Sequence, residues 1–355
     1  MQPYPAPWRP AVARGGSQIT SRDRDRTAPA DGRRPPDPGS RSFPDAVAVR
    51  RGPRGLARLL AVALVAVLVG ACGPIGGAPA TPRVPTTDPP AGSLPDFTRV
   101  WVVVLENKGY DAIVGSADAP FLNTLIADYG LAEDLHGVGR PSQPNYLALF
   151  SGATHGIVDN DAHDFDAPTL ADQLEAAGRT WAVFAENVPP DCYRGEVAEG
   201  GRDGPGEYVR KHEPAISFTS ISDDPARCAR IQDFTAFQPG AADFSLIVPN
   251  LCHDMHDCSV RDGDSWLASF VPRIVETPDW TSGGLLVVTF DEGDPDGGPE
   301  DRVATIVVSP DVSAGYRSDA RLSHYSVLRT VEAAWGLPCL AESCYSDTLR
   351  GFFER

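Results

Sequence analysis

The stretch that decides the fold is VWVVVLEN, residues 100–107. Its first six residues are β-branched, aromatic or aliphatic without a break, and such a run predicts a strand that is buried on both faces. The polar pair Glu106-Asn107 follows the strand directly. In open α/β sheets, ligand sites lie just beyond the carboxyl ends of the strands. This stretch therefore predicts both an α/β fold and the place of its chemistry.

The same pattern recurs along the chain. Four further strands are predicted, at residues 180–185, 244–248, 285–290 and 304–309. Helical patterns lie between them, at residues 120–129, 169–177, 265–275 and 324–335. Such alternation predicts one domain over residues 97–355, an α/β/α sandwich with a mainly parallel central sheet.

The charge of the chain excludes one class of partner. The chain has 355 residues and a formal net charge of −17. Residues 1–71 hold 12 Arg and 5 Asp, a net charge of +7, so the remainder carries −24. A protein with this net negative charge cannot readily neutralise the phosphates of a nucleic acid. We therefore expect no nucleic-acid partner.

The N-terminal part is predicted to be an export signal. Residues 50–71 combine four arginines with a short apolar core at 59–69, which is typical of a signal peptide and too short for an ordinary membrane span. The run VGAC at residues 69–72 resembles a bacterial lipobox, in which the cysteine is lipidated. We therefore expect a lipoprotein anchored to the outside of the cell membrane through Cys72, or a secreted protein.

Two further stretches flank this signal. Residues 1–49 are rich in Arg, Pro, Asp and Gly and have no periodic apolar pattern. They predict a disordered extension, or a start codon assigned too early, with the true start near residues 47–49. Residues 72–96 are rich in Pro and Gly and predict a flexible tether.

The cysteines predict disulfides. Without Cys72 an even number remains, which suits an oxidising compartment. Cys252/Cys258 and Cys339/Cys344 are close enough in sequence to close small loops, and Cys192/Cys228 would form the third pair. Zinc binding is the alternative, but no CxxC spacing occurs.

Acidic side chains follow three of the predicted strands. Glu106 ends the first strand, Asp291-Glu292 ends the strand at 285–290, and the strand at 244–248 leads into CHDMHDC, residues 252–258. Carboxylates gathered at one sheet edge repel each other, and a bound cation would relieve that repulsion. Solvated loop charges are the alternative for any single acidic pair.

Ser142 precedes Gln143-Pro144 at the predicted start of a helix. A serine in this place is most often only an N-cap. The same place offers free backbone N–H groups and the positive end of the helix dipole to a phosphate. Neither a GxSxG elbow nor a GxxxxGK[ST] phosphate loop is present in the sequence.

Seven segments together carry a family resemblance. They are VVVLENKGYDAIVG, APFLNTLIADYGLA, RPSQPNYLALFSG, YVRKHEPAISF, VPNLCHDMHDCSVRDGDSWL, LLVVTFDEGD and LSHYSVLRTVEAAWGLP. In this order the chain resembles the phosphoesterase family of the alkaline-phosphatase superfamily, and most of all secreted actinobacterial acid phosphatases of the phosphatidylinositol-phosphatase type. The resemblance covers residues 98–338 and implies an alkaline-phosphatase-like fold.

The resemblance also implies roles for individual residues. Ser142 matches the nucleophile. Asn145 and the Lys211-His212 pair match positions that contact phosphate. Apart from the resemblance, a phosphate ester needs a proton donor for its departing alcohol, and His212 or His256 is the expected one. The matched metal ligands fall into two groups: Glu106, Asn107, Asp291 and Glu292 beside the nucleophile, and Asp254, His256 and His324 as a second group of metal or phosphate ligands.

The ligand set departs from the two-zinc members of the superfamily, which have Asp-His where this chain has Asp291-Glu292. The first group is therefore all oxygen, which favours Mg²⁺, Ca²⁺ or Mn²⁺ and leaves Zn²⁺ as an alternative. Lys108 also differs from the His or Arg that is frequent in near relatives.

The sequence thus predicts an exported, metal-assisted phosphomonoesterase with a phosphoserine intermediate on Ser142. The expected substrate is a small phosphate ester, a phosphoinositide among the candidates. A phosphodiesterase of the phospholipase C type is the main alternative. A phosphate-binding surface lipoprotein without turnover is a weaker one, and the CxPxR motif of a sulfatase is absent.

Overall fold

The computed structural model describes residues 85–86, 94–198, 207–294 and 302–354. The predicted extension, the signal with Cys72 and most of the tether lie outside these residues, so those predictions stay predictions. No helix in the described ranges combines the length and apolarity that a bilayer crossing requires.

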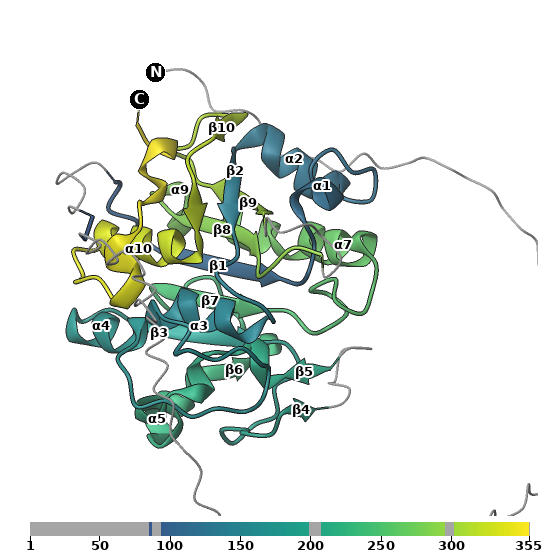
Figure 1. Ribbon diagram of the computed structural model, residues 1–355. Helices are drawn as coiled ribbons and strands as arrows, with labels where there is room; N and C mark the ends of the chain where they lie inside the picture. The colour runs from purple at the N-terminus through teal and green to yellow at the C-terminus, as the bar shows by residue number, and fades with distance from the viewer. Residues whose placement is uncertain (1–84, 87–93, 199–206, 295–301, 355) are drawn as a thin grey trace, which may run out of the picture. The chain divides into compact units, whose positions relative to one another are not determined.

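The described residues form a mixed sheet in the order β10-β2-β9-β8-β1-β7-β3-β6, with β11 paired to β2. Figure 1 shows these strands from β10 at the top to β6 at the bottom. A separate small hairpin joins β4 and β5. The strands are β1 Val100–Leu105, β2 Gly130–His136, β3 Trp181–Ala185, β4 Val197–Ala198, β5 Tyr208–Val209, β6 Ile231–Asp233, β7 Phe244–Val248, β8 Leu285–Phe290, β9 Arg302–Val308, β10 Tyr316–Ser318 and β11 Leu322–Ser323.

The central strands are parallel, as predicted. β8, β1, β7, β3 and β6 pair in parallel, whereas β9 pairs antiparallel with both β8 and β2. Leu105 of β1 pairs with Phe290 of β8. Because these two strands end in register, the next residues, Glu106 and Asp291, leave the sheet at the same level.

The helices lie on both faces of the sheet. Trp181 of β3 contacts Phe150 of α3, whereas Phe184 of the same strand packs on Phe237, which in turn contacts Phe270 of α7. Residues 181 and 184 point to opposite faces because side chains alternate along a strand. α10 and α4 pack beside α3, and α2 and α8 pack beside α7. The predicted α/β/α sandwich is confirmed.

The α-helices are α1 Tyr110–Ile113, α2 Pro120–Asp128, α3 Gln143–Ser151, α4 Leu170–Ala176, α5 Thr219–Ser222, α6 Pro225–Cys228, α7 Val260–Phe270, α8 Pro272–Val275, α9 Pro278–Thr281 and α10 His324–Ala334. The 3₁₀ helices are η1 Arg210–His212, η2 Ala215–Ser217, η3 Phe234–Ala236, η4 Ala341–Tyr345 and η5 Leu349–Phe352.

One predicted helix was wrong, and six strands were not predicted: β2, β4, β5, β6, β10 and β11. The single helix expected at 265–275 is two helices, because Ser259 forms a capping box that starts α7 earlier and Pro272 starts α8. Strand β2 was missed because its sequence, GLAEDLH, contains a polar pair where the register shifts. The other predicted strands and helices begin and end within two residues of their expected positions.

All three predicted disulfides are present. Cys192 pairs with Cys228, Cys252 with Cys258, and Cys339 with Cys344. The second of these closes the loop after β7, which carries two of the predicted site residues, Asp254 and His256.

Candidate active site

Ser142 lies against a carboxylate at the end of the central strand. It is the N-cap residue of α3, and its Oγ donates to Oε2 of Glu106 over 3.0 Å. Both side chains are buried. β1 and α3 therefore bring together the predicted nucleophile and the first predicted metal ligand.

Two further side chains hold the same carboxylate. The Tyr146 hydroxyl donates to Oε1 of Glu106, and Nε2 of His212 lies 3.2 Å from Oε2. The rings of Tyr146 and His212 are stacked, with centroids 5.1 Å apart. Sequence reasoning missed Tyr146, although its spacing of four residues from Ser142 places both on one face of α3.

Glu106 and His212 form a buried ion pair, and His212 also faces Asp254. Burial raises the pKa of Glu106, but the charge of His212 and hydrogen bonds from His212 and Tyr146 outweigh it, so the net pKa is lowered. Burial lowers the pKa of His212, but the charge of Glu106 and the contact with Asp254 raise it by more. The net pKa of His212 is therefore raised. Nδ1 of His212 lies 3.5 Å from Oδ2 of Asp254. Both acids therefore favour the protonated form of the imidazole that lies between them.

Burial raises the pKa of Asp254 to about 6. Its loop is fixed from two sides: Oδ1 of Asn250 accepts from the backbone N–H of His253, and the His253 ring contacts the carboxylate of buried Glu186 at 2.8 Å. His256 lies on the rim, with its side chain 32% exposed and Nδ1 2.6 Å from Asp257.

The second acidic pair lies beside Glu106. Burial raises the pKa of Asp291 well above its usual range, and the charges of Glu106 and Glu292 add to that effect. Oδ1 of Asp291 accepts from the backbone N–H of Asn107 over 3.0 Å. Arg140 lies 3.5 Å from Glu292 and supplies a partial counter-charge.

The donor chemistry of this site fits a hard cation. With its amide nitrogen turned inward, Asn107 reaches Oε2 of Glu106 at 2.8 Å and Oδ1 of Asp291 at 3.2 Å. Turned the other way, the amide would present a third oxygen to the same point, which is stable only around a cation. In the described ranges no group of three or more His, Cys, Asp or Glu side chains is already arranged for a metal.

Two predicted residues have other contacts in this structure. Oδ1 of Asn145 accepts from the backbone N–H groups of Val138 and Gly139, and its Nδ2 donates to Gly139, so the amide shapes that loop. Nε2 of His324 donates to the main-chain carbonyl of Asp291. A phosphate-binding role of Asn145 and a ligand role of His324 stay predictions.

The expected free N–H groups at the start of α3 are largely occupied. The N–H of Gln143 donates to Oδ1 of Asn160, and that of Asn145 donates to the carbonyl of Ser142. Pro144 has none. Lys211 is a charged alternative for holding phosphate, since it is close enough to lower the pKa of Glu106.

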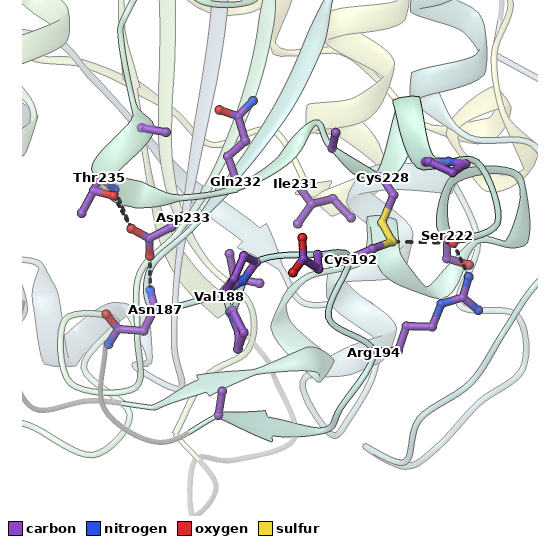
Figure 2. Close-up of a pocket in the computed structure, with 17 residues that line it drawn as sticks. Asn187, Val188, Cys192, Arg194, Ser222, Cys228, Ile231, Gln232, Asp233 and Thr235 are labelled. Atoms are coloured by element: carbon purple, nitrogen blue, oxygen red, sulfur yellow. Dashed lines mark hydrogen bonds between the residues drawn. A yellow bond between two sulfur atoms is a disulfide. The ribbon is translucent and has the colours of Figure 1, made fainter. Parts of the chain in front are cut away.

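Two hollows lie near this part of the fold. The larger, about 1110 Å³, is shown in Figure 2 beside the Cys192–Cys228 disulfide, Asn187 and Asp233. None of the predicted catalytic residues lines it, so size alone does not mark the site. The smaller, about 140 Å³, is lined by Gln143 and Lys211, the chain neighbours of Ser142 and His212.

Fold and site define a class: an α/β/α enzyme whose acid-rich site lies beyond the ends of parallel strands. Within that class, the model of the phosphoesterase family matches residues 115–338. The chain belongs to this family and is a hydrolase of phosphoric ester bonds.

Two relatives and one solved structure illustrate the match. Phosphatidylinositol-3-phosphatase of Mycobacterium tuberculosis is 35% identical over 289 residues, 79% of this chain and 87% of that protein. The phosphate-repressible acid phosphatase of Penicillium chrysogenum is 31% identical over 287 residues, 77% of this chain and 67% of that protein. The lipoteichoic acid synthase LtaP of Listeria monocytogenes, 11% identical, superposes with a TM-score of 0.54 over 76% of this chain and 79% of its own, which shows the fold alone.

Proposed function

We propose that this protein is an exported, metal-assisted phosphomonoesterase that acts through a phosphoserine on Ser142. The observation that carries the proposal is the contact of Ser142 Oγ with Oε2 of Glu106 at 3.0 Å, beside His212 at 3.2 Å from the same oxygen. The names of the two relatives, both phosphatases, favour monoesters over diesters.

In the first step, Ser142 gives its hydroxyl proton to the Glu106 carboxylate, Oγ forms a bond to phosphorus, and the bond from phosphorus to the alcohol oxygen breaks. Glu106 orients the hydroxyl, because its lowered pKa keeps the carboxylate ionised and able to accept the hydroxyl hydrogen bond. The departing alcohol takes a proton from His212 or His256. Two acids raise the pKa of His212 and favour its protonated form, whereas His256 lies on the exposed rim.

In the second step, water attacks phosphorus from the side opposite Ser142. The water gives a proton to the histidine that protonated the alcohol, the bond from phosphorus to Oγ breaks, Ser142 takes its proton back from Glu106, and inorganic phosphate leaves. Lys211, which lowers the pKa of Glu106, and Arg140, which lies 3.5 Å from Glu292, would counter the charge of the phosphoryl oxygens in a site otherwise rich in carboxylates.

A divalent cation fits among Glu106, Asn107, Asp291 and Glu292, where Mg²⁺, Ca²⁺ or Mn²⁺ suits the oxygen donors better than Zn²⁺. When bound, it would neutralise the carboxylates and lower the pKa of the serine hydroxyl. Asp254, His256 and His324 are the candidates for a second metal or for direct phosphate contact.

Export is supported by the predicted signal at residues 50–71 and by the three disulfides of the catalytic domain. Cys72 would anchor the protein to the outside of the membrane by its lipid. A phosphoinositide is one candidate substrate, since a relative is named for such a lipid, and another small phosphomonoester is the alternative.

The test compares p-nitrophenyl phosphate with bis(p-nitrophenyl) phosphate in the presence of each metal. The monoester should be preferred, Ser142→Ala should lower kcat by about 10⁴-fold or more, and acid quenching during turnover should trap phosphate on Ser142. Preference for the diester would replace this proposal with the phosphodiesterase alternative. A Ser142→Ala protein as active as wild type would refute the phosphoserine.

A further inference from the structure

The smaller hollow beside the nucleophile contains a buried polar group that the mechanism above does not use. Gln143 follows Ser142 on α3 and is only 2% exposed. Its Oε1 accepts no hydrogen bond from any of the described residues. A buried amide oxygen is seldom left without a donor, so a ligand that brings one would complete this site.

Gln143 lines a cavity of about 140 Å³ whose walls come from three parts of the chain. Asn160 and Asp161 come from the loop after α3, Glu196 precedes β4, and Lys211 comes from η1. α3 packs directly on η1, so the cavity lies between the segment that carries Ser142 and the segment that carries His212. Gln143 and Lys211, which line the cavity, are the chain neighbours of Ser142 and His212, and on this ground we infer that a group bound here lies beside the reacting phosphate.

The walls determine what the cavity accepts. Three of its polar groups, Gln143 Oε1 and the carboxylates of Asp161 and Glu196, offer oxygen acceptors. The Asn160 oxygen is already occupied by the Gln143 N–H at 3.1 Å. A ligand matched to such walls brings several O–H donors. Lys211 and Arg210 also line the cavity, and the Arg210 guanidinium is paired with Asp164 at 2.6 Å. Their positive charges disfavour a cationic ligand.

We propose that this cavity is the leaving-group site and that it selects a polyhydroxylated alcohol through Gln143, Asp161 and Glu196. A volume of about 140 Å³ corresponds to roughly four or five water molecules at about 30 Å³ each, so the alcohol is a small polyol. This inference rests on the proposed phosphomonoesterase activity and specifies its substrate class.

The test uses two esters with the same carbon chain, glycerol 3-phosphate and n-propyl phosphate. They differ only by hydroxyl groups, so their ratio of kcat/KM reports hydroxyl recognition. Wild type should prefer glycerol 3-phosphate by about tenfold or more, and Gln143→Met should lower that ratio about five- to tenfold, as expected for one buried hydrogen bond.

Two further variants keep the test decisive. Glu196→Gln, on the exposed rim, should lower the same ratio even if Gln143→Met does not fold. Gln173→Met, a second buried glutamine that lies on α4, should leave the ratio unchanged.

The outcomes separate this inference from the proposed function. Hydrolysis of p-nitrophenyl phosphate with a glycerol-to-propyl ratio near one, a ratio unaffected by Gln143→Met, or preference for phosphoethanolamine would overturn the polyol site alone. No hydrolysis of any monoester would overturn both proposals. Comparing inositol 3-phosphate with dioctanoyl phosphatidylinositol 3-phosphate then tells whether the polyol is free or a lipid headgroup, and either result supports the site.

Discussion

The hydroxyl of Tyr146 donates to one oxygen of the Glu106 carboxylate while Ser142 donates to the other. Tyr146 lies one helical turn after Ser142, so a single helix presents both donors to the end of β1. The carboxylate is thereby held with a defined oxygen toward the nucleophile. We infer that Tyr146 is a positioning residue for the reaction.

Tyr146→Phe should therefore lower kcat by about 10- to 100-fold with little change in KM, the effect of losing a hydrogen bond to a charged group. Phenylalanine keeps the stacking on His212. The matched control is Tyr208→Phe, because the buried Tyr208 hydroxyl has no hydrogen-bond partner among the described residues. Steady-state kinetics with a melting curve for each variant make the measurement. Equal losses of activity in the two variants would contradict the positioning role.

The sequence predicted the residues of the site better than their contacts. Glu106 and Asp291 follow buried strands, and the ends of parallel strands meet at one edge, so their proximity followed from local pattern. The partners of Asn145 and His324 depend instead on where a loop and a distant carbonyl lie after folding. Tyr146 has an apolar ring typical of a core residue, and nothing in the pattern shows that its hydroxyl reaches a carboxylate.

Asp291→Asn should make the metal-free protein more stable and less active. Burial and the neighbouring acids raise the pKa of Asp291, so the folded state holds this carboxyl at a cost that grows as pH rises above its ordinary pKa. An amide removes that cost but is a weaker ligand for a cation. Melting curves at pH 7 with chelator should give the variant a higher Tm than wild type. Added Mg²⁺ or Mn²⁺ should raise the Tm of wild type alone, and a metal response retained by the variant would argue against Asp291 as a ligand.

Glu332 should make the fold less stable as pH rises from about 4.5 to 7. Burial raises its pKa to about 7, although the side chain accepts hydrogen bonds from Leu340 and Ser343. Below pH 4.5 Glu332 is protonated in both the folded and the unfolded state, so it does not change the free energy of unfolding. Above pH 7 Glu332 is ionised in both states. The raised pKa then lowers the free energy of unfolding by about 3 kcal/mol, because each unit of pKa difference between the two states corresponds to about 1.4 kcal/mol.

The variant Glu332→Gln should flatten the decline of unfolding free energy across this window, measured by urea unfolding at several pH values. Glu276→Gln, at an exposed glutamate, is its control. If both variants keep the slope of wild type, the loss of stability arises from other acids.

The Cys252–Cys258 disulfide should matter for catalysis more than for stability. It closes the loop that carries Asp254 and His256, whereas Cys339–Cys344 closes a loop of similar length, with sequence separations of 6 and 5. Opening either loop should reduce the unfolding free energy by a similar amount, about 2 kcal/mol on the chain-entropy model. Only the first loop places a carboxylate 3.5 Å from His212.

The double variant Cys252→Ser/Cys258→Ser should therefore lose about tenfold or more in kcat, measured at a temperature where both double variants are folded. The control, Cys339→Ser/Cys344→Ser, should stay within about twofold of wild type. Equal activities would mean that the contacts of Glu186 and Asn250 suffice to hold the loop.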